Sequence, residues 1–140
     1  MTPASAQGQG SRSPQFLPDQ KHFLYVEPRS QPPFPVYVGS LDEPGQQGKQ
    51  IAEVDAGTAK YASGHLFYLH EDQLVAQPFD PDRLEVSGEP VRLADAITTI
   101  GVPGRMAAFD VSASGLLIYH SGQAGGRSHL EWVDRTGNLS

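Results

Sequence analysis

The sequence predicts an all-β fold, and a repeated strand motif is the strongest reason for this prediction. A short apolar run that ends in tyrosine occurs three times, as Phe23-Leu24-Tyr25, Leu66-Phe67-Tyr68 and Leu117-Ile118-Tyr119. The 140 residues include 15 glycines and 12 prolines, about a fifth of the chain against about an eighth in average proteins. These residues separate short strands with turns. No apolar pattern with the helical period of about 3.6 residues continues for three turns, which disfavours long helices.

The spacing of the repeated runs predicts a more specific architecture. Their tyrosines are 43 and 51 residues apart, and a second apolar strand ending at an aspartate (Asp42, Asp80 or Asp134) follows each run. A period of roughly 40–50 residues that contains only short strands is typical of β-propeller blades. The sequence therefore predicts a partial β-propeller, with about two complete four-stranded antiparallel blades plus a truncated third.

The predicted units divide the chain as follows. Residues 1–13 are polar and glycine-rich, which predicts a disordered tail or linker. Residues 14–140 form the incomplete propeller, with blades at approximately 14–55, 57–96 and 105–140. Because propellers close with about four to eight blades, we expect a piece of a larger propeller or a fragmentary reading frame. Alone, it would expose an apolar sheet face and unpaired strand edges.

Turn residues mark the strands of the first unit. Pro18-Asp19-Gln20-Lys21 predicts a tight turn because proline presets φ. Gln31-Pro32-Pro33 predicts a loop, and Asp42-Glu43-Pro44-Gly45 predicts a second turn. The expected strands are 15–17, 22–27, 35–41 and 50–54.

The second and third units repeat this order. Ala62-Ser63-Gly64, Glu71-Asp72-Gln73 and Asp80-Pro81-Asp82-Arg83 are the expected connections of the second unit, and Ser112-Ala113-Ser114-Gly115 is a turn of the third. The expected strands are 59–61, 65–70, 74–79 and 90–94, then 106–111, 116–120 and 129–134.

Composition excludes several functional classes. The chain has 16 acidic and 10 basic residues, a net charge of −6, and no cluster of Lys or Arg, so we expect no nucleic-acid partner. No apolar run is long enough to span a membrane, and the N-terminus lacks the features of a secretory signal. The absence of cysteine excludes disulfides, thiol catalysis and cysteine-ligated zinc.

Histidines are the first candidates for a metal site. Zinc would need three or four converging ligands, and repeat-equivalent positions such as those of His22 and His65 lie on different blades. We therefore expect the histidines to be polar residues that flank turns, and we expect no metal site. The five histidines are His22, His65, His70, His120 and His129.

The acidic segment from Asp80 to Glu85 is a candidate calcium site. Asp80, Asp82 and Glu85 could supply oxygen ligands, but Pro81 and Leu84 interrupt the calcium-loop pattern. We expect a turn in which aspartate accepts backbone N–H groups.

The glycine-containing segments carry no recognisable chemistry. Ser121-Gly122 and Gly125-Gly126 lack the sequence of a nucleophile elbow or a phosphate loop, so Ser121–Arg127 is expected to be a hairpin loop. Gly8-Gln9-Gly10 has no strand before it and no helix after it, which indicates a flexible linker rather than a dinucleotide site.

Aromatic residues within the repeated strands could form a platform for carbohydrate, but their positions favour a core between blades. These residues are Phe23, Tyr25, Phe67, Tyr68, Tyr119 and Trp132. The residues themselves therefore predict no catalytic, cofactor-binding or metal-binding side chain.

Several phrases resemble a known family. Pro14–Asp19 with His22–Tyr25 is similar to the core motif of TolB-like, WD-repeat-like β-propellers, except that Gln20 replaces the usual glycine. We therefore expect the first hairpin turn to be less tightly left-handed. Further phrases resemble the propeller region that follows the kinase domain in many bacterial serine/threonine protein kinases. They are Val36–Asp42, Leu74–Asp80, Gly88–Val91 and Trp132–Gly137, and the likeness covers about residues 14–138.

The resemblance implies a non-catalytic sensing, ligand-binding or protein-interaction module. The glycine-rich loop, the His-Arg-Asp loop and the Asp-Phe-Gly motif of kinases do not occur in this sequence, so no enzyme activity is expected. The implied partner is a protein or small ligand, and the parent protein would supply further blades or a kinase domain. Attachment to a membrane-spanning kinase implies an extracytoplasmic location, whereas expression alone without a signal peptide implies the cytoplasm.

Two other contexts fit the same motifs. One is the gating propeller of a prolyl-oligopeptidase-like serine hydrolase, whose catalytic residues would lie outside this chain. The other is a free-standing periplasmic interaction protein of the TolB type.

Overall fold

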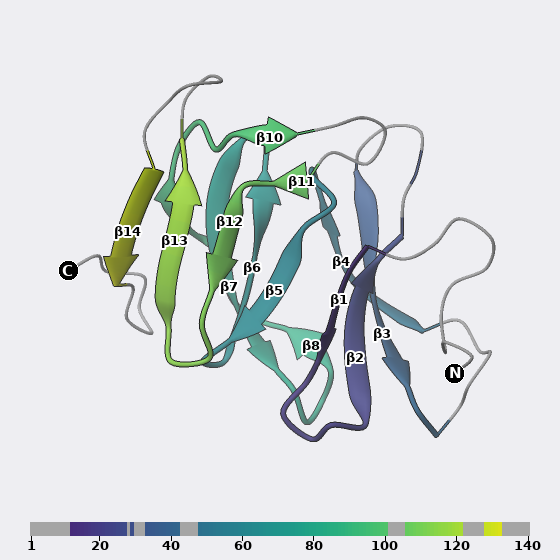
Figure 1. Ribbon diagram of the computed structural model, residues 1–140. Helices are drawn as coiled ribbons and strands as arrows, with labels where there is room; N and C mark the ends of the chain where they lie inside the picture. Colours follow the sequence, from purple (N-terminus) through teal and green to yellow (C-terminus); the bar gives the residue numbers. More distant parts are fainter. Residues whose placement is uncertain are drawn as a thin grey trace.

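The computed structural model describes residues 12–27, 29, 33–42, 48–100, 106–121 and 128–132. Every regular element within these ranges is a β-strand, and every strand pair is antiparallel (Figure 1). The predicted all-β class is therefore confirmed. The described part of the chain contains no helix with the length and hydropathy needed to cross a membrane.

The first sheet is a four-stranded meander, as predicted for the first unit. Its strands are β1 (Arg12–Phe16), β2 (His22–Val26), β3 (Phe34–Ser40) and β4 (Lys49–Val54), and they pair in chain order. Strand β1 begins two residues earlier than the boundary expected at residue 14. Part of the expected turn 42–45 lies outside the described residues.

The second sheet contains the predicted meander and one additional strand. β5 (Ala59–Ala62), β6 (His65–His70), β7 (Gln73–Asp80) and β9 (Val91–Ala94) form the meander, because β9 pairs with β7 from Leu74 to Ala76. The additional strand is β8 (Glu85–Val86), which pairs with the last residues of β7. The sequence pattern does not predict β8.

The third sheet has three described strands in chain order. They are β12 (Phe109–Val111), β13 (Leu116–His120) and β14 (Ser128–Trp132). The bounds of β13 agree with the prediction. The last two residues of the strand predicted at 129–134 lie outside the described residues.

The single strand predicted at 106–111 is wrong. β11 (Met106–Ala107) pairs with β10 (Thr99–Ile100) in a separate two-stranded sheet, and the chain changes partner at Ala108. The N–H of Ala108 donates to the carbonyl of Thr98 at 2.9 Å, which holds the break between β11 and β12 in place.

The first, second and third sheets, leaving aside the two-stranded sheet of β10 and β11, lie in chain order across the molecule (Figure 1), and two apolar clusters join them. The strand β6 shows why both faces of the second sheet are apolar. Leu66 and Tyr68 belong to the cluster shared with the first sheet, whereas Phe67 and Leu69 belong to the cluster shared with the third. Successive side chains of a strand point to opposite faces, so one strand contributes to both cores.

The stacking order defines two faces for each sheet. We call the face toward the next sheet in the chain the forward face, and the opposite face the backward face. In the third sheet, the backward face is the one that packs on the second sheet, and the forward face is the other one. The first strands of the sheets also contact one another, since β5 contacts both β1 and β12. The sheets are thus joined through their first strands as well as through the two apolar clusters.

Candidate functional site

The forward face of the third sheet carries an exposed apolar position. In β13, Leu117 and Tyr119 are buried against the second sheet, and Ile118 between them is 47% exposed. Asp110, directly opposite Ile118 in β12, is also exposed. A single exposed apolar side chain is ordinary on a protein surface. This face is the candidate site because Ile118, like Leu24 and Phe67, precedes the tyrosine of a repeated run, and those two residues are buried against the following sheet.

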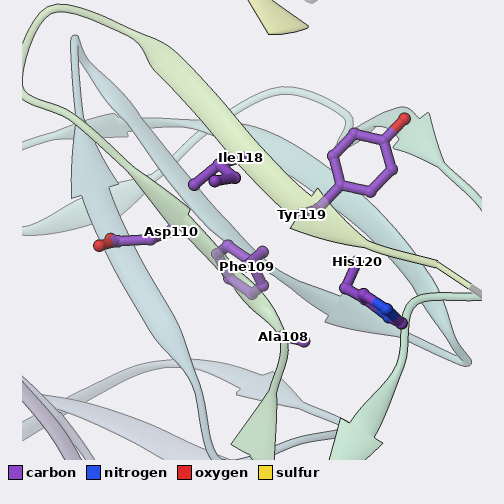
Figure 2. A pocket seen from close by; sticks show the side chains of 6 residues that line it. All are labelled: Ala108, Phe109, Asp110, Ile118, Tyr119 and His120. Atoms are coloured by element: carbon purple, nitrogen blue, oxygen red, sulfur yellow. The ribbon is translucent and has the colours of Figure 1, made fainter. Parts of the chain in front are cut away.

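An open depression of about 220 Å³ lies at this position. Figure 2 shows the side chains that line it, which come from β12, from β13 and from the residue that precedes β12. They are Ala108, Phe109, Asp110, Ile118, Tyr119 and His120. The lining combines aliphatic and aromatic groups with one carboxylate and one imidazole.

His120 is fixed at the edge of the depression. Its Nδ1 lies 2.8 Å from the Thr98 hydroxyl oxygen, and its backbone N–H donates to the carbonyl of Ala108 at 2.9 Å. The backbone N–H of Thr98 in turn donates to the carbonyl of His120 at 3.0 Å. The imidazole is therefore held by its neighbours at the rim.

Two side chains fix the sheets relative to one another. Gln15 of β1 forms two hydrogen bonds with the backbone of Tyr61 in β5, at 2.9 Å and 2.7 Å. The buried hydroxyl of Thr58 accepts the N–H of Ala107 at 3.0 Å. Neither role could be predicted from the sequence, because the partners of both residues are more than 40 positions away and no local pattern marks them.

The histidines do not come together in space. His22 bonds the Asp19 carboxylate at 2.6 Å, and His65 lies 3.0 Å from the carbonyl of Ser63, so both interact with residues of the turn before them. This agrees with the predicted role of turn-flanking residues. Within the described ranges, no three His, Asp or Glu side chains are placed to hold a metal ion.

The other histidines are separate from these two. His70 is exposed, 3.7 Å from Asp55 and 3.4 Å from Glu71, and His120 lies at the depression. The side chain of His129 is outside the described residues.

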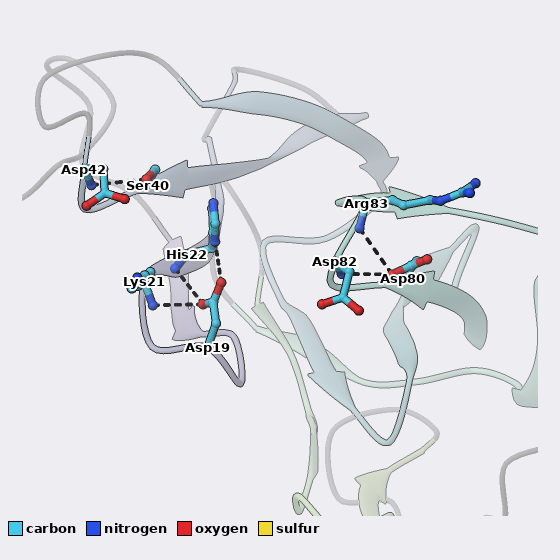
Figure 3. Close-up of polar contacts among 8 residues, drawn as sticks. All are labelled: Asp19, Lys21, His22, Ser40, Asp42, Asp80, Asp82 and Arg83. Carbon is cyan, nitrogen blue, oxygen red and sulfur yellow. Dashed lines mark hydrogen bonds and ion pairs between the residues drawn. The ribbon is translucent and has the colours of Figure 1, made fainter.

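The Asp80 turn is the structure that was predicted for it. One oxygen of the Asp80 carboxylate accepts the backbone N–H of Asp82 at 2.8 Å and that of Arg83 at 3.2 Å (Figure 3). Leu84 then takes a left-handed φ of 58°, and Glu85 begins β8. The carboxylate of Asp80 is thus used to hold the turn that leads into β8.

The Asp19 turn is built in the same way (Figure 3). Its carboxylate accepts the N–H groups of Lys21 at 2.8 Å and His22 at 2.9 Å. The hydrogen bond from the His22 side chain, with these two backbone bonds, lowers the pKa of Asp19 to about 2. The looser turn expected from Gln20 is wrong, because Gln20 adopts a left-handed φ of 60° without being glycine.

Most of the aromatic side chains named above lie in the core. Phe67, Tyr68 and Tyr119 lie between sheets, as predicted. Tyr25 is also buried, but it lies on the backward face of the first sheet, where Phe23 is only half-buried. The side chain of Trp132 is outside the described residues.

Burial changes the ionisation of two of these tyrosines. It raises the pKa of the Tyr25 and Tyr68 hydroxyls, and for Tyr25 the hydrogen bond from the Gly48 N–H partly offsets the effect. Both hydroxyls therefore stay protonated to a higher pH than an exposed tyrosine.

The predicted loop at Ser121–Arg127 and the linker containing Gly8-Gln9-Gly10 fall mostly outside the described residues. Ser121 itself forms an isolated antiparallel bridge with Ile97.

Comparison of the chain with family models, curated proteins and solved structures gives no match.

Proposed function

We propose that this chain is a non-catalytic β-propeller segment that acts as a protein- or ligand-interaction module. Three successive antiparallel sheets that pack on one another support the propeller, and so does the contact of β5 with both β1 and β12. Blades of a propeller are arranged in this way, with their first strands around a common axis.

The single observation that carries an interaction role is the exposed forward face of the third sheet. Ile118 is about half exposed beside a depression whose rim holds Asp110 and His120. The turns at Asp19 and Asp80 have their carboxylates committed to backbone hydrogen bonds. The apolar face is therefore the better candidate for contact with a partner.

The resemblance supplies the biological context of the proposal. The module would be the sensory or scaffolding half of a bacterial serine/threonine kinase, derived from the region C-terminal to the kinase domain. Its partner would then be a protein that contains further propeller blades, a kinase domain, or both.

Site-specific photo-crosslinking tests this proposal. A photoreactive phenylalanine analogue is placed at Ile118 in the full chain, and the variant is expressed in cells of the source organism. The matched control carries the same group at Val91 in β9, which is 42% exposed. The expected result is an adduct, at Ile118 only, with a polypeptide that contains propeller blades or a kinase domain.

Two other outcomes have a defined meaning. An adduct with an α/β-hydrolase domain would support the gating propeller of a serine hydrolase instead. The same proteins labelled at both positions with the same yield would contradict an interaction site at Ile118.

A further inference from the structure

One position on the forward face is equivalent in all three sheets. The residue before the tyrosine of each repeated run is Leu24 in β2, Phe67 in β6 and Ile118 in β13. Leu24 is 0% exposed in the core between the first and second sheets, and Phe67 is 4% exposed in the core between the second and third. Ile118 thus has the position at which the other two sheets contact the sheet that follows.

The backward face of the first sheet carries the other half of such a contact. Tyr68 and Tyr119 pack on the sheet before them, and Tyr25 has the same position in the first sheet. Tyr25 is already 1% exposed in the single chain and stacks on Phe23 with ring centroids 5.7 Å apart. The open aromatic surface is therefore that of Phe16, which lies opposite Phe23 and is 58% exposed. This face therefore presents exposed aromatic surface at its β1 edge.

The absence of a side chain at Gly39 lets the Phe23 ring lie against the sheet. Gly39 lies opposite Phe23, and a Cβ built on it would be 2.5 Å from Cζ of the Phe23 ring. The ring therefore rests directly on the backbone of β3.

The first strands add a polar match. Gln15 lies opposite Leu24 and holds the backbone of Tyr61, which belongs to the next sheet. In the third sheet, Asp110 lies opposite Ile118, just as Gln15 lies opposite Leu24. Phe16 in β1 lies opposite the residue two before Tyr25, and Tyr61 in β5 lies opposite the residue two before Tyr68, so these two positions are equivalent. Oδ1 of Asp110 accepts the Val111 N–H at 2.8 Å. A carboxylate with two oxygens can accept further N–H groups but donates none, so Asp110 can also supply the acceptor half of the Gln15 contact.

We propose that the forward face of the third sheet binds the backward face of the first sheet in a second copy of this chain. The inference rests on the function proposed for the same face and names its partner. Ile118 packs against Phe16 and Phe23 of the second copy, and Asp110 accepts the N–H of Phe16 of the second copy. The contact continues the stacking that already joins the three sheets, and it is head to tail, so it closes a ring or extends a chain of copies.

Sedimentation velocity of the purified full chain tests the inference. The wild-type chain is expected to form a species of at least about twice the 15.1 kDa mass of one copy. Ile118→Asp is expected to sediment as a monomer, because it places a charge in the contact. Val91→Asp, a change at a similarly exposed position of β9, is the control and is expected to associate like the wild type. Circular dichroism verifies that each variant is folded, and Ile118→Asn is a milder second variant.

Mixing two variants distinguishes the head-to-tail contact from a symmetric one. Phe16→Asp damages only the backward face and Ile118→Asp only the forward face, so each is expected to be monomeric alone. Together they are expected to form a 1:1 complex that grows no further, since each retains one intact face.

The inference is overturned if the wild-type chain is monomeric at every soluble concentration, if Ile118→Asp associates like the wild type, or if the mixture stays monomeric. Should a purified monomer still cross-link at Ile118 to a different protein in cells, the proposed function stands and the second copy is excluded. An Ile118-specific adduct in cells that contains only a second copy of this chain, with self-association of the purified chain, removes the kinase context and leaves the second copy as the partner.

Discussion

The side chain of Gln15 binds both backbone polar groups of Tyr61. Its Nε2 donates to the Tyr61 carbonyl at 2.9 Å, and its Oε1 accepts the Tyr61 N–H at 2.7 Å. Gln15→Ala leaves a partly buried donor and acceptor unpaired between two sheets, so we expect the free energy of unfolding to fall by about 1–3 kcal/mol. Urea denaturation followed by circular dichroism measures the change.

Gln15→Glu is the matched control for this contact. The carboxylate still accepts the Tyr61 N–H, but its second oxygen faces the Tyr61 carbonyl oxygen to which Nε2 donated. The loss of stability of Gln15→Glu is therefore expected to be at least as large as that of Gln15→Ala. Equal stability of the alanine variant and the wild type would show that the contact does not tie the sheets together.

Leu24 and Ile118 occupy equivalent positions with opposite exposure. Leu24→Ala removes a fully buried side chain, and we expect a loss of about 2–5 kcal/mol. Ile118→Ala is expected to change the stability of the dilute monomer by about 0.5 kcal/mol or less, as at exposed positions generally. Thermal and urea unfolding at low protein concentration compare the two. Similar losses in both variants would mean that the third sheet is covered in the monomer.

The Asp19 turn predicts an acid-sensitive contribution to stability. The pKa of Asp19 is lowered to about 2 in the folded chain, whereas an unfolded aspartate has a pKa of about 3.9. The contribution is therefore complete above the unfolded value and is lost as the pH falls toward 2. NMR titration of the Asp19 carboxyl measures the pKa, and Asp19→Asn is expected to flatten the stability profile in this window. A pKa near 4 for the folded protein would contradict the turn geometry.

The buried tyrosines predict alkaline sensitivity. Burial raises the pKa of Tyr25 and Tyr68 above the ordinary value, so the folded state favours the neutral hydroxyl. The stability that they contribute is present below the unfolded pKa of about 10 and is lost as the pH rises through the folded values. Ultraviolet titration is expected to show these tyrosines ionising later than exposed ones. Tyr25→Phe and Tyr68→Phe identify the two transitions by their disappearance.

The left-handed conformation of Gln20 predicts a stabilising substitution. A residue with a Cβ pays roughly 1–2 kcal/mol in this region, and glycine avoids that cost while losing more freedom on folding. Gln20→Gly is therefore expected to raise the free energy of unfolding by about 0.5–1 kcal/mol. Lys21→Gly next to it, where no positive φ occurs, is expected to lower it. A decrease in both variants would contradict the strain at Gln20.

Strands with a strong local pattern were predictable from the sequence. His65–His70 and Leu116–His120 were predicted with their observed bounds, because each is an apolar run between turn residues. The aspartate turn at Asp80 was also predictable, since the side chain bonds the backbone two and three residues ahead. In these places the local sequence alone determines the structure.

Elements that depend on distant contacts could not be predicted in this way. Strand β8 has two residues and therefore no period, and the break at Ala108 depends on hydrogen bonds with Thr58 and Thr98. The candidate site has the same limit. Leu117-Ile118-Tyr119 looks like the other two runs, and only the stacking of the sheets shows that Ile118 is exposed.

The alternation along β6 has a consequence for how the molecule comes apart. Leu66 and Tyr68 pack against the first sheet, while Phe67 and Leu69 pack against the third. Unfolding of either outer sheet would therefore expose apolar side chains of the same central strand. Unfolding of the first or the third sheet would thus destabilise the second sheet, on which the remaining sheet packs. Heating should therefore produce one cooperative unfolding transition rather than two successive ones.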